Sequence, residues 1–156
     1  MSRINEVTGA IIGAAIDVHR APGPGLLEST YHACLVYELR QRGWFVQSQK
    51  PLPVIHKGVR LDCGYRVDLL VQDAVIVELK AVDEVIPIHT AQLLSDLRLT
   101  GKSVGLLINF NVKILTDGVD RVVNQYAETW ITSYASRPKS SRSGIPFPVL
   151  LGLCGG

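Results

Sequence analysis

The sequence has few cysteines and no long apolar run. Only three of its 156 residues are cysteines, and no two of them form a CxxC pair. An odd number without such a pair argues against a disulfide framework and against a zinc site. No apolar run reaches the roughly 18 residues that a membrane-spanning helix needs, and the N-terminus lacks the basic start and apolar stretch of a signal peptide. We therefore expect a soluble cytoplasmic protein without membrane contacts.

A surplus of charge of one sign is also absent. Sixteen Lys and Arg against fourteen Asp and Glu give a formal net charge of +2 at pH 7. This near balance provides no overall attraction for nucleic acid, so any such contact would depend on a local patch. Four cations are candidate phosphate contacts if folding brings them to one face: Arg66, Lys102, Lys113 and Arg121.

The first part of the chain has the pattern of two helices. Residues 4–18 place apolar side chains three and four positions apart, as in an amphipathic helix. Two prolines and two glycines within 21–25 end that pattern, because neither residue type continues a helix well. Residues 26–42 are rich in helix formers and are followed by Gly43, a natural stop.

Short β-rich runs follow, interrupted by one further helix. The strands of a predicted meander lie at 44–46, 53–55, 59–63, 65–71 and 75–81. Residues 88–99 return to helical spacing, and the apolar run 104–110 predicts an interior strand with both faces covered. Edge strands are predicted at 114–115 and 119–123. This order predicts a mixed α/β (α+β) protein.

The composition changes near residue 136. Residues 136–156 are rich in serine, proline and glycine and carry three cations without an acid. This composition predicts a disordered or loosely docked tail. We therefore expect one domain over residues 1–135 and a tail over 136–156.

Three charged side chains interrupt the most apolar and strand-like part of the chain, GYRVDLLVQDAVIVELKAV at 64–82: Asp68, Glu78 and Lys80. Charged side chains are rarely buried unless they are paired or bind an ion. A three-residue turn at 72–74 would set Asp68 opposite Glu78, with Cβ atoms roughly 4.5 to 5.5 Å apart. Because strand side chains alternate, Lys80 would share the face of Glu78.

Two interpretations of this trio are open. A divalent cation would turn the repulsion between Asp68 and Glu78 into attraction, because carboxylate oxygens are hard ligands. Such a site suits phosphodiester hydrolysis: the metal shields the phosphate charge and lowers the pKa of its bound water, while Lys80 orients or helps deprotonate that water. The plainer alternative is an exposed cross-strand set of charges. The apolar residues on both sides of Glu78 weigh against it.

The order and spacing of Asp68 and Glu78-Leu79-Lys80 resemble the signature of the PD-(D/E)xK nuclease superfamily. Residues 25–31, GLLESTY, look like the motif that names the GxxExxY proteins, a branch of that superfamily, and AQLL at 91–94 makes the combination specific. The resemblance runs from about residue 4 to residue 123. It implies a restriction-endonuclease-like fold, a central mixed β-sheet flanked by helices.

The resemblance also implies roles for single residues. Asp68 and Glu78 match the metal-binding carboxylates, and Lys80 matches the catalytic lysine. Glu28 matches a glutamate that reaches the metal from a helix. Tyr31, three positions on, would lie on the same helical face and orient Glu28 by a hydrogen bond.

Two further positions belong to the same motifs. Gly25 is the glycine of GxxExxY, in a supporting role, and Gln92 matches a glutamine that orients Lys80 or the substrate. Related proteins often carry a tyrosine four residues after that glutamine, whereas this sequence has Asp96, which puts a substrate contact at position 96 in question. None of the four histidines has the spacing of a metal site, although His89 would lie close to the site near a helix start.

Two functions follow. The first is a nuclease dependent on Mg²⁺ or Mn²⁺ that acts on nucleic acid, DNA more than RNA. The second is a nuclease-like, catalytically weak or inactive module that binds or regulates, as a homodimer or with a partner protein. The presence of every expected catalytic residue type favours the first, and the nearly neutral charge leaves the second open.

Overall fold

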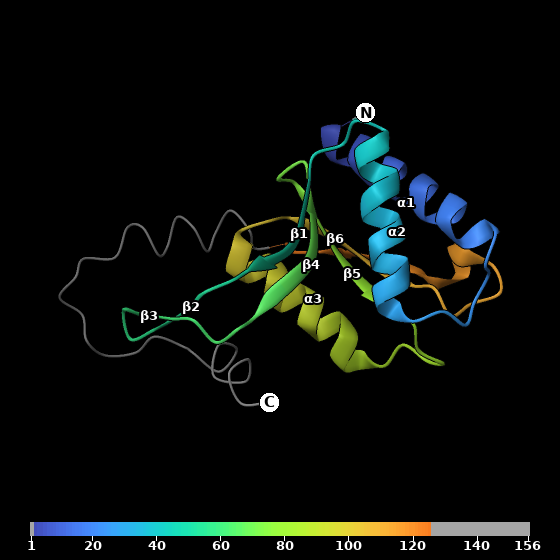
Figure 1. Cartoon of the computed structure of the whole chain (residues 1–156). Helices are drawn as coiled ribbons and strands as arrows, with labels where there is room; N and C mark the ends of the chain where they lie inside the picture. The colour runs from blue at the N-terminus through green and yellow to red at the C-terminus, as the bar shows by residue number, and fades with distance from the viewer. Residues whose placement is uncertain (1, 126–156) are drawn as a thin grey trace.

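The computed structural model describes residues 2–125 (Figure 1). Its helices are α1 (Arg3–Arg20), α2 (Glu28–Gln41), α3 (Pro87–Thr100) and the short 3₁₀ helix η1 (Leu115–Gly118). Its strands are β1 (Val46–Pro51), β2 (Val54–His56), β3 (Val59–Leu61), β4 (Arg66–Val71), β5 (Val75–Lys80), β6 (Val104–Asn109) and β7 (Val119–Val123). The three predicted α-helices are therefore confirmed.

Five strands form a central sheet in the order β1-β4-β5-β6-β7. Neighbouring strands are antiparallel except β5 and β6, which run parallel and are joined through α3. A parallel pair needs such a crossover, because a tight turn cannot return the chain to the same end of the sheet. All six residues of β6 are buried, which confirms the predicted interior strand. This mixed sheet with flanking helices is the expected fold class and is consistent with a restriction-endonuclease-like fold.

Two apolar layers cover the faces of the sheet. α1 and α2 pack on one face, against buried side chains of β4, β5 and β6. α3 packs on the other face through Leu93 and Leu97. The approach of α3 is close at Gly105, where a Cβ would lie 2.7 Å from Leu93 Cδ1. Both faces of β5 are therefore covered, so a charged side chain on this strand needs a chemical cause.

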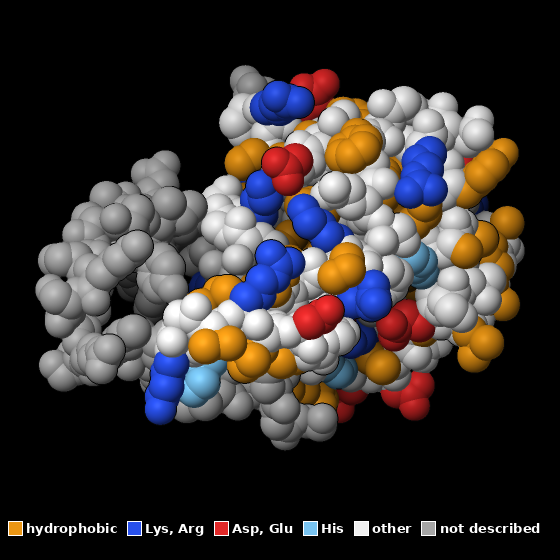
Figure 2. Space-filling model, turned by 60° about the vertical axis from the view of Figure 1, so that its left-hand side comes forward, with side chains coloured by type: hydrophobic (Ala, Val, Ile, Leu, Met, Phe, Trp, Pro, Cys, Tyr) orange, Lys and Arg blue, Asp and Glu red, His pale blue; other side chains and the backbone are white. Residues whose placement is uncertain are grey.

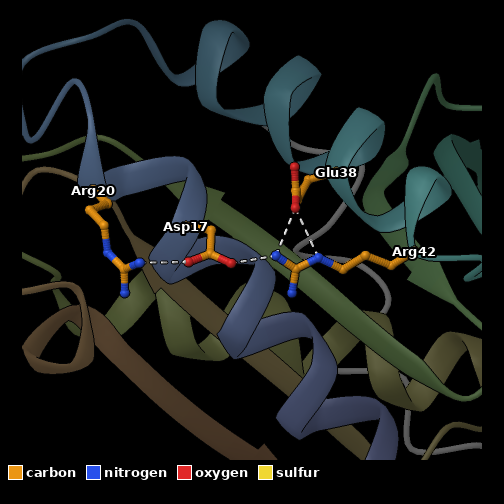
Figure 3. Close-up of polar contacts among 4 residues, drawn as sticks. All are labelled: Asp17, Arg20, Glu38 and Arg42. Atoms are coloured by element: carbon orange, nitrogen blue, oxygen red, sulfur yellow. Dashed lines mark hydrogen bonds and ion pairs between the residues drawn. The ribbon is translucent and has the colours of Figure 1, made fainter.

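Ion pairs link α1 to α2 (Figure 3). Asp17 lies between two arginines, with its Oδ1 3.3 Å from Arg20 Nη1 and its Oδ2 2.5 Å from Arg42 Nη2. Arg42 Nη2 also lies 2.7 Å from Glu38 Oε1. These side chains are a third or more exposed, so each pair adds little stability and mainly aligns the two helices.

The predicted meander is wrong in its first part. β1 pairs with β4, while β2 and β3 form a separate two-stranded ribbon that projects from the body of the protein (Figure 1). The β1–β4 ladder ends at the pair Pro51–Arg66, and one further backbone hydrogen bond joins Leu52 N to Tyr65 O at 2.8 Å. The pairing does not continue at Pro53, which has no N–H to donate to a ladder. The first strand begins at Val46 instead of lying at 44–46.

The edge predictions are half right. The strand predicted at 119–123 is confirmed as β7, an edge of the sheet, whereas η1 begins within the strand predicted at 114–115. No helix within residues 2–125 is long and apolar enough to cross a membrane. The tail predicted at 136–156 lies outside the described residues.

Candidate active site

The β4–β5 hairpin has the predicted register. Its paired residues are Leu69 with Val77, Leu70 with Ile76, and Val71 with Val75, so the turn is 72–74. Asp68 and Glu78 are the next residues beyond the pair Leu69–Val77, on the side away from the turn. We call this end of the hairpin the open end. Asp68 Oδ2 accepts a hydrogen bond from Leu79 N at 2.8 Å. The side chain of Asp68 is thus held by the backbone of β5.

β4 is irregular at Asp68. Val67 belongs to the apolar layer under α3, whereas Leu69 belongs to the layer under α1 and α2, although residues two apart on a regular strand share a face. On β1, Gln49 lies opposite Asp68, between the pairs Ser48–Leu69 and Lys50–Val67. Gln49 has a φ of +51°. A local irregularity of this kind changes the direction in which one side chain points. Here it turns a carboxylate toward the open end instead of into the core.

Glu78 and Lys80 lie on one face of β5, as predicted. Lys80 Nζ is 3.2 Å from Glu78 Oε1, and their side chains are only 16% and 13% exposed. An ordinary surface pair would be far more exposed, so the alternative of a solvated cross-strand set is wrong for these two residues. Burial raises the pKa of Glu78 to about 8, the charge of Asp68 adds to this rise, and Lys80 opposes it.

Glu28, the first residue of α2, belongs to the same group of charges. Burial raises its pKa; the nearby Lys80 lowers it and the nearby Asp68 raises it. Glu28, from α2, thus interacts with Asp68 of β4 and Lys80 of β5, and the same two residues interact with Glu78. That these four residues form one active site stays a prediction.

The loop before α2 explains how Glu28 is placed. Tyr31 is 1% exposed and stacks on Phe110, with ring centroids 4.5 Å apart. Its hydroxyl donates to Gly23 O at 2.5 Å and accepts from Leu26 N at 3.2 Å. The direct hydrogen bond from Tyr31 to Glu28 that we expected is therefore wrong, and Tyr31 instead fixes the loop that leads into the helix.

Gly25 lies within this loop. Its φ is +108°, a conformation that L side chains rarely adopt, so a glycine is favoured there. No heavy atom comes within 4 Å of a Cβ built at this position, so the requirement is one of backbone conformation and not of space. The supporting role predicted for Gly25 thus has a physical basis in the turn.

α3 contributes a buried carboxylate, Asp96, to which the sequence assigned no role. Gln92 is half-buried and lies one helical turn before Asp96, which is only 1% exposed. The Tyr65 hydroxyl donates a hydrogen bond to Asp96 Oδ1. Burial raises the pKa of Asp96 to about 7, and this hydrogen bond opposes the rise. Asp96 also adds to the rise in the pKa of Glu78, so it lies beside the open end.

The model of one protein family, described as the PD-(D/E)XK nuclease superfamily, matches residues 5–122. The chain belongs to the PD-(D/E)XK nuclease superfamily. The match runs from α1 to β7 and includes every residue of the candidate site. It confirms the superfamily predicted from sequence and does not separate the GxxExxY branch from others. No curated protein and no solved structure matches the chain.

Two more residues of this PD-(D/E)XK protein support the site and were not predicted. His32 Nε2 lies 3.2 Å from Asp68 O and 3.2 Å from Ser48 Oγ, so it links α2 to β4 and β1. Its position four residues after Glu28, on the same helical face, could have indicated this. Asn109 is buried and hydrogen-bonds both the N–H and the C=O of Val82, which fixes the chain just after Lys80.

His89 also lies at the site, as expected from its place near a helix start. Its Nδ1 accepts a hydrogen bond from Ile86 N at 3.2 Å, which caps the first turn of α3. Its charge lowers the pKa of Glu28, so the two side chains are close.

The donor set of this PD-(D/E)XK protein fits a hard divalent cation, although three ligands are not assembled. Asp68 and Glu78 offer carboxylate oxygens, and the raised pKa of Glu78 reflects buried negative charge that a cation would balance. Within residues 2–125 no group of three or more His, Cys, Asp and Glu side chains lies close enough to hold a metal. Glu78 is instead paired with Lys80. The expected three-carboxylate set that includes Glu28 is thus not formed in this arrangement.

The four candidate phosphate contacts do not gather on one face. Lys102 Nζ pairs with Asp73 Oδ1 at the turn end of the hairpin, away from the open end. Arg121 donates to Asn5 Oδ1, and Arg66 donates to Gln49 O at the start of β4. Lys113 lies after the C-terminal end of β6, and so at the opposite end of the sheet from Lys102. Only Arg66 adjoins Asp68 along a strand.

Proposed function

We propose that the protein is a metal-dependent nuclease of the GxxExxY branch that hydrolyses phosphodiester bonds in nucleic acid, DNA more than RNA. The observation that carries this proposal is the convergence of Asp68, Glu78 and Lys80 at the open end, in a chain of a nuclease superfamily. The burial of Glu78 and Lys80 has a cost in stability that a surface role would not require.

Asp68 and Glu78 would hold one Mg²⁺ or Mn²⁺ ion, and Glu28 would be the third carboxylate at that ion. When bound, the ion supplies charge stabilisation for the phosphate and a more acidic water. Asp68 is the most firmly placed of the three carboxylates, because the N–H of Leu79 holds one of its oxygens. Its other oxygen is free of that bond and is the natural ligand atom.

Lys80 would act on the attacked phosphate and its water. Its ammonium group now neutralises part of the charge of Glu78, and it is only 16% exposed. With Glu78 engaged as a ligand, the same ammonium group can donate to a phosphate oxygen or orient the attacking water. Gln92 would orient Lys80 or the substrate from α3.

The second candidate function is a nuclease-like module that binds nucleic acid or a partner protein without cleaving. One observation favours it: Glu78 is paired with Lys80, and no three-ligand group is assembled within residues 2–125. The two functions differ in one respect: the nuclease binds a metal ion at the open end and the binding module does not.

The test is cleavage of labelled single- and double-stranded DNA and RNA in Mg²⁺, Mn²⁺ or EDTA by wild type, Asp68→Asn and Lys80→Ala. Asp68→Asn keeps an oxygen for the N–H of Leu79 and removes the charge that a metal needs. We expect each variant to lower the rate at least about 100-fold. The matched control is Asp73→Asn, the same substitution at the exposed turn of the same hairpin, where the side chain is 69% exposed.

Metal binding gives a readout that does not depend on cleavage. Mn²⁺ at about 100 times its Kd stabilises a protein that binds it only when folded by about 2.7 kcal/mol. We expect Mn²⁺ to raise the Tm of wild type and of Asp73→Asn, but not of Asp68→Asn. Equal, metal-independent inactivity of all variants, without any Mn²⁺ effect on Tm, would favour the binding module.

A further inference from the structure

The ribbon formed by β2 and β3 has no role in the sheet. It leaves the sheet at the pair Pro51–Arg66, and its own pairing runs from Val54–Leu61 to His56–Val59. In Figure 1 it projects away from the body on the side opposite α1. We call residues 53–64 the arm, because Leu52 and Tyr65 still hydrogen-bond to each other next to the sheet and pack under α3. At about 3.3 Å per residue, its tip at Lys57-Gly58 extends at most about 23 Å beyond Pro51.

The arm and its base differ in charge from the rest of the protein. Residues 49–67 contain four cations, Lys50, Lys57, Arg60 and Arg66, and one acid, Asp62. Within residues 2–125 as a whole, cations and acids are equal in number. The segment 49–67 thus has three more cations than acids, and within it Lys57, Arg60 and Asp62 lie on the arm itself. Figure 2 shows this side of the molecule, with Lys and Arg side chains spread across it.

The cations of the arm are also unpaired. Arg20, Arg42, Lys80 and Lys102 each make an ion pair with an acid. Within the described part of the chain, the exposed Lys57 and Arg60 make none. Exposed cations of this kind on a projecting element complement a polyanion.

The arm is continuous with the open end. Arg66 begins β4 at the base of the arm, and Asp68 follows two residues later on the same strand. At strand spacing their Cα atoms are about 7 Å apart. A chain of phosphates held along the arm would therefore run directly to Asp68, Glu78 and Lys80.

We propose that the arm grips double-stranded DNA and delivers one strand to the open end. This inference rests on the proposed nuclease function and names its substrate class. The major groove of B-form DNA is about 12 Å wide and admits a two-stranded β-ribbon, whereas the major groove of duplex RNA is too narrow and deep for one. Lys57 and Arg60 contact the phosphates, and the exposed Val59 and Leu61 lie against the groove wall.

The test measures binding without cleavage, in EDTA, by fluorescence anisotropy. The probes are a 20-base-pair DNA duplex, an RNA duplex of the same sequence and one of the DNA strands. We expect the DNA duplex to bind tightest. The double variant Lys57→Ala/Arg60→Ala should weaken duplex binding on the order of tenfold and reduce the slope of log K against log salt by about 1.8, at about 0.9 per lost phosphate contact.

The matched control is Arg3→Ala/Arg20→Ala, which removes two exposed cations from α1 on the far side of the protein. It should leave affinity and salt slope unchanged. Because Lys57 and Arg60 make no ion pair within residues 2–125, the arm variant should keep the wild-type Tm and elution volume. If the arm variant instead has a different oligomeric state from wild type, the proposal is overturned, because the arm cations would then lie in a contact between two copies of the chain.

Three other results would also overturn it: an unchanged salt slope in the arm variant, equal weakening by the control, or tighter binding of the single strand or RNA duplex. The result is separable from the proposed nuclease activity. If the protein binds duplex DNA through the arm and cleaves no substrate, the proposed role of the arm is supported and the proposed nuclease function is contradicted. If the protein is a nuclease and the arm variant binds DNA as tightly as wild type, only the proposed role of the arm is contradicted.

Discussion

The two ends of the β4–β5 hairpin carry the same kind of ion pair in opposite settings. At the turn, Lys102 Nζ lies 3.1 Å from Asp73 Oδ1, and Asp73 is 69% exposed. At the open end, Lys80 Nζ lies 3.2 Å from Glu78 Oε1, and Glu78 is 13% exposed. The distances are nearly equal, so geometry does not distinguish the pairs; the surroundings do.

The surroundings change what each pair does to the protein. At the turn, water solvates the Asp73 carboxylate, which is 69% exposed, although Lys102 is only 23% exposed, so the two ends differ mainly in the burial of the acid. At the open end, burial and the neighbouring Asp68 raise the pKa of Glu78 to about 8, and Lys80 only partly offsets them. Such a pair opposes folding when it is charged. An arrangement that costs stability and faces a second carboxylate is more consistent with a role in chemistry than in folding.

The largest effect is expected from Glu78→Gln, measured by urea unfolding in EDTA. The pKa of Glu78 is raised from 4.5 in the unfolded chain to about 8, so the folded protein holds the proton more tightly. The stabilisation is complete below pH 4.5 and is lost as the pH rises through about 8. At pH 9, where wild-type Glu78 is ionised, we therefore expect Glu78→Gln to raise the free energy of unfolding, on the order of 1 kcal/mol or more.

The control is Asp73→Asn at the turn, which should change the free energy of unfolding by no more than about 0.5 kcal/mol at any pH. The gain for Glu78→Gln should shrink toward pH 4. A loss of stability at pH 9, or the same small change for both variants, would contradict the contrast between the two ends.

A smaller effect is expected from Tyr65→Phe, which removes the hydroxyl that donates to Asp96. This hydrogen bond lowers the pKa of Asp96, so its loss should raise that pKa further above about 7. A hydrogen bond to a charged group contributes about 1.5–3 kcal/mol, so Tyr65→Phe should lose that much at pH 9. It should lose less at pH 5, where the Asp96 carboxyl is protonated.

Urea unfolding at the two pH values, with the Asp96 carboxyl followed by NMR, measures both effects. The matched control is Tyr37→Phe, because Tyr37 is 64% exposed and should lose nothing. Equal behaviour of the two variants would mean that the hydroxyl of Tyr65 does not stabilise the Asp96 carboxylate.

The contrast between the ends also marks what the sequence could and could not predict. The register of the β4–β5 hairpin follows from local alternation and the position of the turn, so the turn at 72–74 and its three flanking pairs were predictable. The irregularity of β4 at Asp68 was not. The contact of Tyr65 with Asp96 joins residues 31 apart on different elements, and no periodic pattern encodes it. It depends on how α3 packs under the sheet.

The arm was missed for a related reason. The short runs of β2 and β3 have strand propensity, and propensity does not say which partner a strand takes. β1 was displaced because its sequence, VQSQKP, is too polar to stand out as a strand. β1 pairs with β4, which lies further along the chain, and no local pattern encodes that pairing. The prolines at 51 and 53 mark the point after which the residues between β1 and β4 lie outside the sheet.

The smallest effect is expected from Lys102→Ala, which removes the ion pair at the turn. Because Asp73 is largely solvated, the free energy of unfolding should fall by less than about 1 kcal/mol. Salt should reduce this loss further, since exposed charges are screened over about 10 Å at 0.1 M. Urea unfolding at 0.05 and 0.5 M NaCl checks both points. A loss of several kcal/mol that salt does not change would mean that the turn pair behaves like a buried one, and the difference between the two ends would then not lie in their exposure to water.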